Sequence, residues 1–263
     1  MYSKQFPLIS IITVVYNGSK TLEQTIQSVL NQSYKNIEYI IIDGGSTDGT
    51  IKIVKEYEKD ISHWLSERDK GLYDAMNKGV SLAKGELIGI INSDDWYELD
   101  AVKIIVDAYL KNPDKCIFHG DRYDIDNEGN RREYKFNKSK FKFIYFSMTF
   151  NHPSMFIHKN IYSVYKYNIE FRSISDYEFV LKVFLKSNDL FHYIPFTYVN
   201  YRLDGISAKQ SLISEIKEGS QARLNAGLKC RHVLVFIILK FIRYILKEVF
   251  RIKYISGDFS SSK

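Results

Sequence analysis

Two adjacent carboxylates, Asp94 and Asp95, directly follow the apolar run Ile88–Ile91 and the small residues Asn92 and Ser93. This order is typical of a buried strand that ends at a sheet edge. Neighbouring carboxylates repel each other unless a proton or a cation lies between them. Carboxylate oxygens suit Mg²⁺ or Mn²⁺, ions that are usually shared with substrate phosphates. A solvated Asp-Asp turn before a helix is the competing interpretation.

Strands and helices alternate in the first hundred residues and would position these carboxylates. Apolar runs predict buried strands at Leu8–Tyr16, Ile37–Ile42, Ile61–Leu65 and Ile88–Ile91. Helical spacing of apolar residues predicts helices over Thr21–Gln32, Thr50–Tyr57 and Lys70–Lys84. The alternation predicts a doubly wound, Rossmann-like α/β sheet that is mostly parallel.

Polar turns follow each of these strands, and in such a sheet ligands bind at the carboxyl ends of the strands. The turns contain Tyr16, Asn17, Asp43, Asp69, Lys70, Asp94 and Asp95. Lys70 would hold a phosphate as a point charge. For Asp43, which begins a Gly-rich turn, a local Asx turn is the other interpretation.

The second half of the chain has a less regular pattern. We expect a helix over Leu99–Lys111 and a strand over Cys116–Gly120 that ends at Asp121. A hairpin turn at Glu128-Gly129-Asn130 is predicted to join the strands Tyr123–Ile125 and Arg132–Phe136. Further short strands are predicted at Met155–His158, Leu190–Ile194 and Tyr198–Tyr201. Helices are predicted over Asp176–Lys186, with Ser175 as the N-cap, and from Ser211 to about Gly227.

The composition of the 263 residues favours a packed globular protein, with 45% hydrophobic residues and four prolines. Cys116 and Cys230 form neither a disulfide framework nor a metal-ligand pattern, which favours a reducing compartment. The first seven residues lack the apolar region of a signal peptide. We therefore expect a cytoplasmic protein.

The formal charge of +6 is concentrated between Lys229 and Lys253, where seven basic residues stand against one acidic residue. Within His232–Ile255 the longest wholly apolar run has seven residues, far below the roughly 20 needed to span a bilayer. Its basic residues recur at helical spacing and form one stripe; they are Lys240, Arg243, Lys247 and Arg251. The pattern predicts a helix in the interface of an anionic membrane. Packing on the body or on a second subunit is the alternative, so a homo-oligomer stays open.

Several motifs, in this order along residues 7–205, together resemble the inverting family-two glycosyltransferases of the GT-A fold. They are Val15-Tyr16-Asn17, the Asp43–Thr50 turn, Ser66–Gly79, Asn92-Ser93-Asp94-Asp95, His119-Gly120-Asp121, His152–Phe156 and Ser175–Glu178. Asn92, Met76 and Ser175 depart from the residues common in the family. The segment Ser66–Gly79 is similar to that of a subgroup that assembles bacterial surface polysaccharides. The resemblance implies a catalytic domain over residues 1–227 and leaves 228–263 as a basic amphipathic tail.

The resemblance also implies metal-dependent transfer of a hexose, with inversion, from a nucleoside diphosphate sugar to a hydroxyl of a glycan or lipid-linked acceptor. UDP is the nucleotide most common in the family, and the ion would be Mn²⁺ or Mg²⁺ held by Asp94 and Asp95. Asp176 would be the general base. The implied donor-binding residues are Tyr16, Asn17, Asp43, Asp69, Lys70, Asn77 and Asp94, and the implied acceptor-binding residues are Asp121, His152 and Glu178.

Some of these residues also have purely structural interpretations. Asp176 would interact with the dipole at the start of its helix, and His152 would be a packed turn residue. Two other functions remain as alternatives to sugar transfer. A nucleotidyltransferase also uses paired Asp residues, although the turn Asn17–Lys20 lacks a triphosphate loop. A nucleic-acid-binding protein would use the basic tail, but the bulky aliphatic residues there argue against it. We therefore expect no nucleic-acid partner and place the protein at the inner face of the cell membrane.

Overall fold

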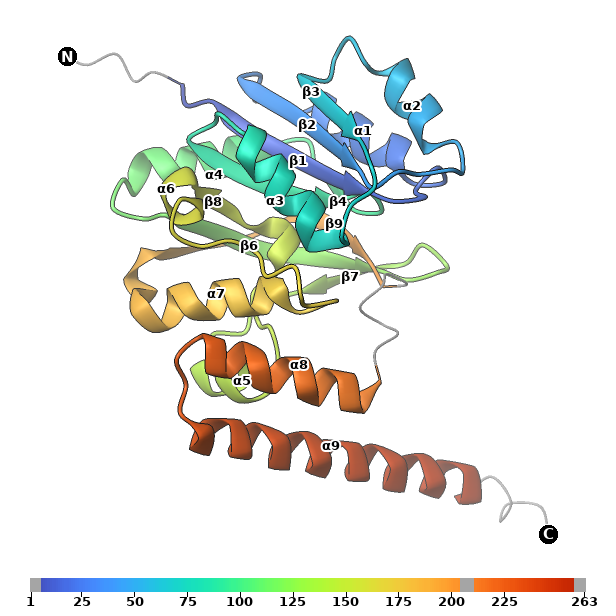
Figure 1. The fold of residues 1–263 in the computed structure, drawn as a ribbon, viewed down its shortest axis with the longest axis vertical. Coiled ribbons are helices and arrows are strands. Elements are labelled where there is room, and N and C mark those ends of the chain that lie inside the picture. Colours follow the sequence, from blue (N-terminus) through green and yellow to red (C-terminus); the bar gives the residue numbers. More distant parts are fainter. Residues whose placement is uncertain (1–5, 204–210, 258–263) are drawn as a thin grey trace.

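The apolar runs predicted as strands form the centre of a nine-stranded sheet (Figure 1) within residues 6–203 and 211–257, the parts that this computed structural model describes. The strands are β1 (Ile9–Val15), β2 (Ile37–Asp43), β3 (His63–Ser66), β4 (Leu87–Asn92), β5 (Trp96–Tyr97), β6 (Ile117–Ile125), β7 (Arg131–Tyr134), β8 (Phe156–His158) and β9 (Phe191–Arg202). The helices are α1 (Leu22–Leu30), α2 (Thr50–Glu56), α3 (Leu72–Leu82), α4 (Ala101–Lys111), α5 (Lys140–Tyr145), α6 (Lys159–Tyr162), α7 (Ser175–Lys186), α8 (Leu212–Asn225) and α9 (Cys230–Gly257). Short 3₁₀ turns lie at η1 (His152–Ser154) and η2 (Asn188–Leu190).

The strand order is β3-β2-β1-β4-β8-β6-β9-β5, with β7 paired to β6. Strand β1 pairs in parallel with both β2 and β4, and β9 runs parallel to β6. Only β5, β7 and β8 of the described strands run antiparallel to their neighbours. The predicted α/β architecture with a mostly parallel sheet is therefore confirmed.

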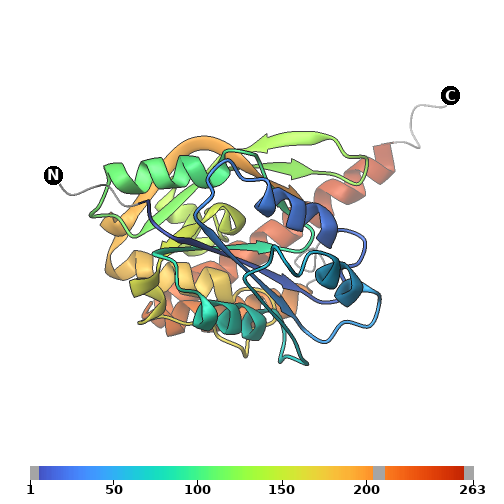
Figure 2. The same ribbon diagram turned by 90° about the horizontal axis from the view of Figure 1, so that it is seen from above.

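Helices cover both faces of the sheet, as Figure 2 shows from above. One core contains Leu22 and Ile26 of α1 and Ile105 of α4, packed on the sheet. The other core contains Met76 of α3 and Val180 of α7. Amphipathic helices placed on opposite faces bury both sides of the strands, which explains why β1 and β4 are almost wholly apolar.

The register of the parallel strands brings their polar turns together. Val15 at the end of β1 lies opposite Asp43 at the end of β2, and Val14 lies opposite Asn92 at the end of β4. The residues that follow these three strands therefore leave the sheet at one edge, as predicted.

The second half of the chain differs most from expectation. Strand β6 does not end at Asp121 but continues to Ile125, because its outer half is paired on both sides, by β7 and β9. The two short strands predicted around Pro195 are one strand, β9. The pairing partners jump from Tyr193 to Thr197 at this point, so Pro195 lies in a bulge, where its missing N–H costs no ladder bond.

Smaller corrections concern strand and helix starts. The predicted strand at Met155 begins one residue later, at β8, and the predicted strand at Ile61 begins at His63. Ser175 is not the N-cap of α7; Ile174 takes that position, and Ser175 is the first helical residue. Its hydroxyl instead accepts a hydrogen bond from the Asn168 N–H.

The tail forms the predicted helix, α9, and its first half packs on the body. In Figure 1, α7, α8 and α9 lie one below the other, and α9 contacts α8 and α5. The stripe facing the body is Val233, Phe236 and Lys240, each buried. The expectation that Lys240 borders a membrane-facing surface is wrong, because its ammonium pairs with Glu215 of α8. Lys247 and Arg251 lie outside the part of the chain whose side chains are described. No helix within the described ranges has the length and apolar character needed to cross a bilayer.

Candidate active site

Asp43 is fully buried at the end of β2 and organises the turn behind it. Its Oδ2 accepts hydrogen bonds from the N–H groups of Gly45 and Ser46, each at 3.0 Å, and from the Ser66 hydroxyl at 2.7 Å. Asp43 therefore stabilises a local turn through Oδ2, as the structural interpretation of this residue predicted. Its Oδ1 is buried without a hydrogen-bond partner among the described residues. A buried carboxylate oxygen in that state has free capacity for a donor N–H.

Asn17 links the turn after β1 to the turn after β2. It adopts a positive φ of 51°, accepts from the Thr47 N–H at 2.9 Å and donates its own N–H to Ser46 Oγ at 2.7 Å. Tyr16, the preceding residue, is 66% exposed. A large exposed ring beside an ordered polar turn is available to a ligand.

Asp69 and Lys70 lie in the loop between β3 and α3. Asp69 accepts from the Gly71 N–H at 2.8 Å, and its carboxylate lies so close to Gly44 that an added Cβ there would come within 2.5 Å of it. Asp69 is therefore adjacent to the Asp43 turn. The Lys70 side chain is exposed, whereas its backbone N–H is bonded to Asp74.

The two carboxylates after β4 have different environments. Asp94 is half-buried, whereas Asp95 is 1% exposed, with Oδ1 accepting from the Arg202 N–H at 3.1 Å and Oδ2 facing Asn92 Nδ2 at 3.4 Å. The Arg202 guanidinium donates through Nε to the Asp94 carbonyl and lies over the Trp96 ring. Burial raises the pKa of Asp95 well above its usual range, and the charge of Asp94 adds to this rise.

The side chains of Asp94 and Asp95 are suitable ligands for a divalent cation, because carboxylate oxygens are hard donors. A positive charge between these adjacent residues would stabilise the ionised form of each. The described residues include no cluster of three or more His, Cys, Asp or Glu side chains with metal-binding geometry. An ion held here would complete its coordination with water and substrate phosphates, as Mg²⁺ usually does.

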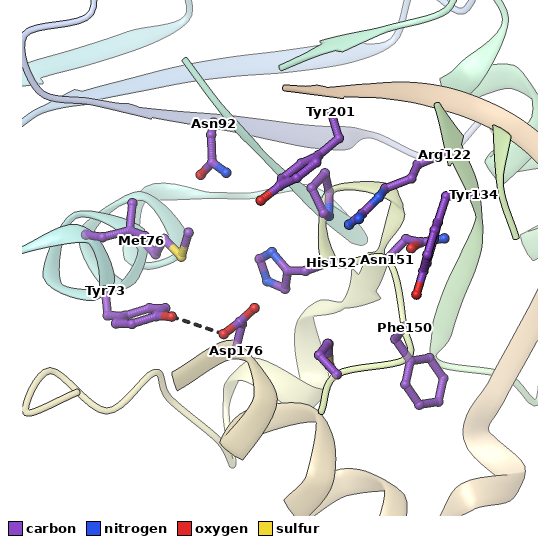
Figure 3. A pocket seen from close by; sticks show the side chains of 13 residues that line it. Tyr73, Met76, Asn92, Arg122, Tyr134, Phe150, Asn151, His152, Asp176 and Tyr201 are labelled. Carbon is purple, nitrogen blue, oxygen red and sulfur yellow. Dashed lines mark hydrogen bonds between the residues drawn. The ribbon is translucent and has the colours of Figure 1, made fainter. Parts of the chain in front are cut away.

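A cavity of about 220 Å³ opens beside this sheet edge (Figure 3). Its walls come from α3, the ends of β4, β6, β7 and β9, the η1 turn and the start of α7. The lining residues are Leu72, Tyr73, Met76, Asn92, Arg122, Tyr134, Met148, Phe150, Asn151, His152, Pro153, Asp176 and Tyr201. Asn92 connects it to the carboxylate pair, because Asn92 immediately precedes Ser93-Asp94-Asp95.

Asp176 and His152 both reach this cavity, as Figure 3 shows. Tyr73 donates its hydroxyl to Asp176 Oδ1 at 3.0 Å. His152 Nε2 is 3.0 Å from the Tyr167 hydroxyl. Burial lowers the pKa of His152, so the imidazole is neutral near pH 7, although the charge of Asp176 opposes this shift. The cavity thus contains a carboxylate and a neutral imidazole.

Among the predicted site residues in the described part of the chain, only Asp176 and His152 line the cavity. The turns at the strand ends hold most of the others, namely Tyr16, Asn17, Asp43, Asp69, Lys70, Asp94 and Asp95. The last three predicted residues make structural contacts elsewhere. Glu178 is buried on another side of α7, where it pairs with Lys182 at 3.0 Å and accepts from Asn225. Residues two apart on a helix point in different directions, so Asp176 and Glu178 cannot serve one pocket. Asp121 accepts from the Phe136 N–H and the Tyr193 hydroxyl.

Asn77 is the third of these residues, and both ends of its amide are used structurally. Its Nδ2 donates to the Tyr167 carbonyl at 2.8 Å, and its Oδ1 accepts from the Tyr167 N–H at 3.1 Å. This reciprocal pair fixes α3 against the loop that carries Tyr167, whose hydroxyl contacts His152. Asn77 therefore holds the backbone of Tyr167, the residue whose hydroxyl contacts His152, and does not itself line the cavity.

Sequence reasoning missed Arg122, Tyr134 and Tyr201, which line the cavity. Arg122 lies between two predicted strand segments, Tyr134 lies in the second strand of the predicted hairpin, and Tyr201 is the last residue of a predicted strand. None of the three was assigned to the site. Extending β6 past Asp121 would have placed Arg122 in the sheet, opposite Tyr134 of β7.

Comparison with known proteins gives the family. A family model described as glycosyl transferase family 2 matches residues 10–169. The chain belongs to this family. This family-two chain is 36% identical over 129 residues to a chondroitin synthase of Escherichia coli, covering 48% of the chain and 19% of that protein. It is 39% identical over 128 residues to an uncharacterised glycosyltransferase of Haemophilus influenzae, covering 48% of the chain and 51% of that protein.

Solved structures have the same fold at low sequence identity. A TarS fragment from S. aureus, residues 1–349 in complex with UDP-GlcNAc, has a TM-score of 0.67 and 18% identity, over 90% of this chain and 73% of that one. The mannosyltransferase PcManGT from Pyrobaculum calidifontis, in complex with GDP-Man and Mn²⁺, has a TM-score of 0.59 and 16% identity, over 83% and 64% of the two chains. The chain matches only part of the two curated relatives described above: 19% of the length of the chondroitin synthase and 51% of the length of the Haemophilus influenzae protein.

Proposed function

We propose that this chain transfers a sugar from a nucleoside diphosphate sugar, with UDP as the first nucleotide to test, to a hydroxyl of a glycan or lipid-linked acceptor, with inversion. One observation carries the proposal: the cavity lined by Asp176 is also lined by Asn92, and Asn92 lies two residues before Asp94 in the chain. A base and a diphosphate-binding edge would then lie on either side of one anomeric carbon.

In the proposed reaction the nucleoside lies over the turns after β1 and β2. The unpartnered Asp43 Oδ1 would accept an N–H of the base, and Asn17 and Asp69 hold the neighbouring backbone in place. The exposed Tyr16 ring and the Lys70 ammonium would contact the base and a phosphate. These roles use the free groups of the described turns without disturbing their internal hydrogen bonds.

Asp176 would accept the proton of the acceptor hydroxyl as that oxygen attacks the anomeric carbon. Because Tyr73 occupies Oδ1, we assign Oδ2 to the acceptor. The neutral His152 would orient the acceptor or the diphosphate by hydrogen bonding. The transition state has oxocarbenium character, so the negative Asp176 also stabilises its charge.

Mn²⁺ or Mg²⁺ would be held by Asp94 and Asp95. When bound, it would stabilise the negative charge that develops on the departing diphosphate. The high pKa of the buried Asp95 fits this assignment, because a cation is what keeps both carboxylates ionised.

Sugar transfer is tested by offering UDP, GDP and dTDP sugars with Mn²⁺ to the full chain and measuring release of the nucleoside diphosphate. We expect one nucleotide class to be hydrolysed slowly without acceptor, and NMR of the transfer product to show an inverted anomeric centre. Retention of configuration would contradict the inverting mechanism. No hydrolysis and no binding of any of these donors would contradict the function itself.

We also propose that the exposed face of α9 binds an anionic membrane surface, which would place the enzyme at the cytoplasmic face of the cell membrane near a lipid-linked acceptor. The described apolar side chains that α9 presents to solvent are Leu234, Val235, Ile238, Phe241, Ile242, Ile245 and Leu246. Arg231 and Arg243 are also exposed on the same helix. Apolar side chains next to basic ones favour an anionic lipid interface over a purely apolar partner. A homo-oligomer through this face is the competing outcome.

Nucleotidyl transfer and nucleic-acid binding, the two other interpretations of the sequence, are not proposed. Nothing in the described part of the chain favours either over sugar transfer.

A further inference from the structure

Arg122 is held rigidly at the wall of the cavity by two aromatic rings. Its guanidinium carbon lies 4.2 Å from the centre of the Tyr201 ring and 4.7 Å from that of Tyr134. Figure 3 shows the guanidinium between these two rings. Stacking on both sides removes most of the freedom of a long side chain and keeps the plane of the guanidinium fixed.

The hydrogen bonds of Arg122 leave its outer edge available. Nε donates to Asp124 Oδ1 at 2.7 Å, and the side chain is 19% exposed. Among the described residues, Nη1 and Nη2 have no hydrogen-bond partner. A guanidinium carries five N–H donors, so four remain for a ligand.

Arg122 forms an ion pair with Asp124 through Nε, and its remaining guanidinium edge faces the cavity, where it can bind a negatively charged group of the substrate. Of the described residues that line the cavity, Arg122 is the only Lys or Arg, and His152 is neutral near pH 7. Asp176 supplies a negative charge for catalysis in the same space. A fixed, planar guanidinium matches the two oxygens of a carboxylate or phosphate.

We propose that Arg122, clamped between Tyr134 and Tyr201, binds an oxyanion of the bound substrates and makes the site selective for an acidic ligand. This assignment rests on the proposed sugar-transfer function. The oxyanion is either a phosphate of the donor or an acidic group on the acceptor sugar, and both use the same bidentate contact. The geometry makes Arg122 a specificity-determining residue rather than a structural one.

The test compares Arg122→Gln with the parent chain by calorimetry. Probes for the donor are UDP and GDP against uridine and guanosine, which lack the phosphates. Probes for the acceptor are p-nitrophenyl β-glucuronide against the β-glucoside, which lacks the carboxylate. The matched control is Arg131→Gln, because Arg131 on the adjacent strand β7 also stacks on a tyrosine, Tyr123, but does not line the cavity.

We expect Arg122→Gln to weaken one acidic probe by about 10- to 100-fold and its neutral partner by less than about 2-fold. Loss on the nucleotides identifies a donor phosphate, and loss on the glucuronide identifies the acceptor. Equal affinities in the parent and variant overturn the proposal, as does an equal loss on charged and neutral probes, which would mean that Arg122 only maintains the shape of the cavity. If the parent chain binds no nucleotide at all, the proposed function itself fails.

Discussion

The Tyr73 hydroxyl donates a 3.0 Å hydrogen bond to Asp176 Oδ1, joining helices α3 and α7 across 103 positions of sequence. Tyr73 is buried, and its pKa is raised well above the usual value by burial and by the charge of Asp176. Tyr73 therefore stays a neutral phenol that can keep donating its hydroxyl to Asp176. It fixes the rotamer of the proposed base.

Replacing Asp176 by Asn should lower kcat by about 10²–10⁴-fold, because the amide keeps the shape but cannot accept a proton. Affinity for the nucleotide should change little, since Asp176 lies away from the strand-end turns. Turnover measured with a donor and acceptor pair, beside calorimetry with the nucleotide, checks this. Turnover within about threefold of the parent would show that the base is another residue.

Replacing Tyr73 by Phe removes only the hydroxyl, so the expected loss in kcat is smaller, about 10- to 150-fold, corresponding to one hydrogen bond to a charged group. The double variant with Asp176→Asn should be no slower than Asp176→Asn alone. Additive losses in the double-mutant cycle would show that Tyr73 acts independently of the base.

Asp95→Asn should abolish Mn²⁺-dependent binding of the nucleoside diphosphate while leaving the melting temperature within a few degrees. The variant removes one of two oxygen donors but keeps the hydrogen bond from the Arg202 N–H. Titration of Mn²⁺ with the nucleotide present, followed by electron paramagnetic resonance, measures it. Asp107→Asn, on the exposed face of α4, is the control. Full activity of the parent in a chelator would rule out the metal site.

Stability should fall in acid because of His119, whose ring is buried among Phe136, Phe150 and Tyr193. Burial lowers the pKa of His119 to about 3. The unfolded chain takes up this proton at a pKa of about 6.5, so the stabilising contribution is complete above pH 6.5 and is lost as the pH falls toward 3. At pH 4.5 the loss is about 2–3 kcal/mol.

This acid effect is measured by urea unfolding at pH 7 and pH 4.5. In His119→Phe the difference between the two pH values should shrink by about that amount. An identical pH dependence in the parent and His119→Phe would contradict the assignment.

Much of the first half could be predicted from sequence, because strands β1, β2 and β4 are continuous apolar runs and each is followed by a polar turn. The candidate site residues there are predicted from their position after these strands. The second half was harder. Pro195 signals a strand break, yet β9 absorbs it in a bulge. The polar residues around Arg122 suggest two strands, one ending at Asp121 and one over Tyr123–Ile125, whereas β7 and β9 hold them in the single strand β6.

Side-chain direction was the other limit on prediction. Glu178 and Asp176 share a motif but not a face, and Asn77 lies in a motif yet bonds the Tyr167 backbone. Only the packing partners decide such cases. Arg122 and the rings around it come from three strands. The hairpin pattern indicates that β6 pairs with β7, but no local pattern indicates that β9 pairs with β6.

The junction of α8 and α9 should be essential to stability. The Arg223 guanidinium lies between the rings of Phe236 at 3.6 Å and Tyr177 at 4.9 Å. Phe236→Ala should cost about 3–5 kcal/mol, because it empties a core position and exposes this cation. Phe241→Ala, on the exposed face of α9, should cost less than about 0.5 kcal/mol.

Chemical unfolding of these two variants checks the prediction. Comparable stability would mean that α9 is a separate appendage, as the boundary at residue 228 predicts. Removing α9 altogether should therefore destabilise the body, which makes truncation a poor test of membrane binding.

Membrane binding is better tested with point variants on the exposed face of α9. Ile242→Glu with Ile245→Glu should abolish co-sedimentation with phosphatidylserine vesicles, because each change places a negative charge at the interface. Ile213→Glu, equally apolar and 80% exposed but on α8, should retain it. Vesicle binding by the double variant would disprove the membrane surface. Conversion of a dimer to a monomer, seen by light scattering, would assign the face to self-association.

The hydrogen bond from Arg202 to Asp95 has a consequence for synthesis of the chain, since the donor follows the acceptor by 107 positions. At about 5–20 residues per second, β9 is made roughly 5–20 s after the Asp94-Asp95 pair. During that interval the ribosome-bound chain has all of β1 to β4 but not the strand that buries Asp95, and β6 lacks its parallel neighbour. An open edge of this kind invites pairing with other chains. Slow or interrupted translation between β6 and β9 should thus favour aggregation, and the enzyme cannot become active until almost the entire sheet has been made.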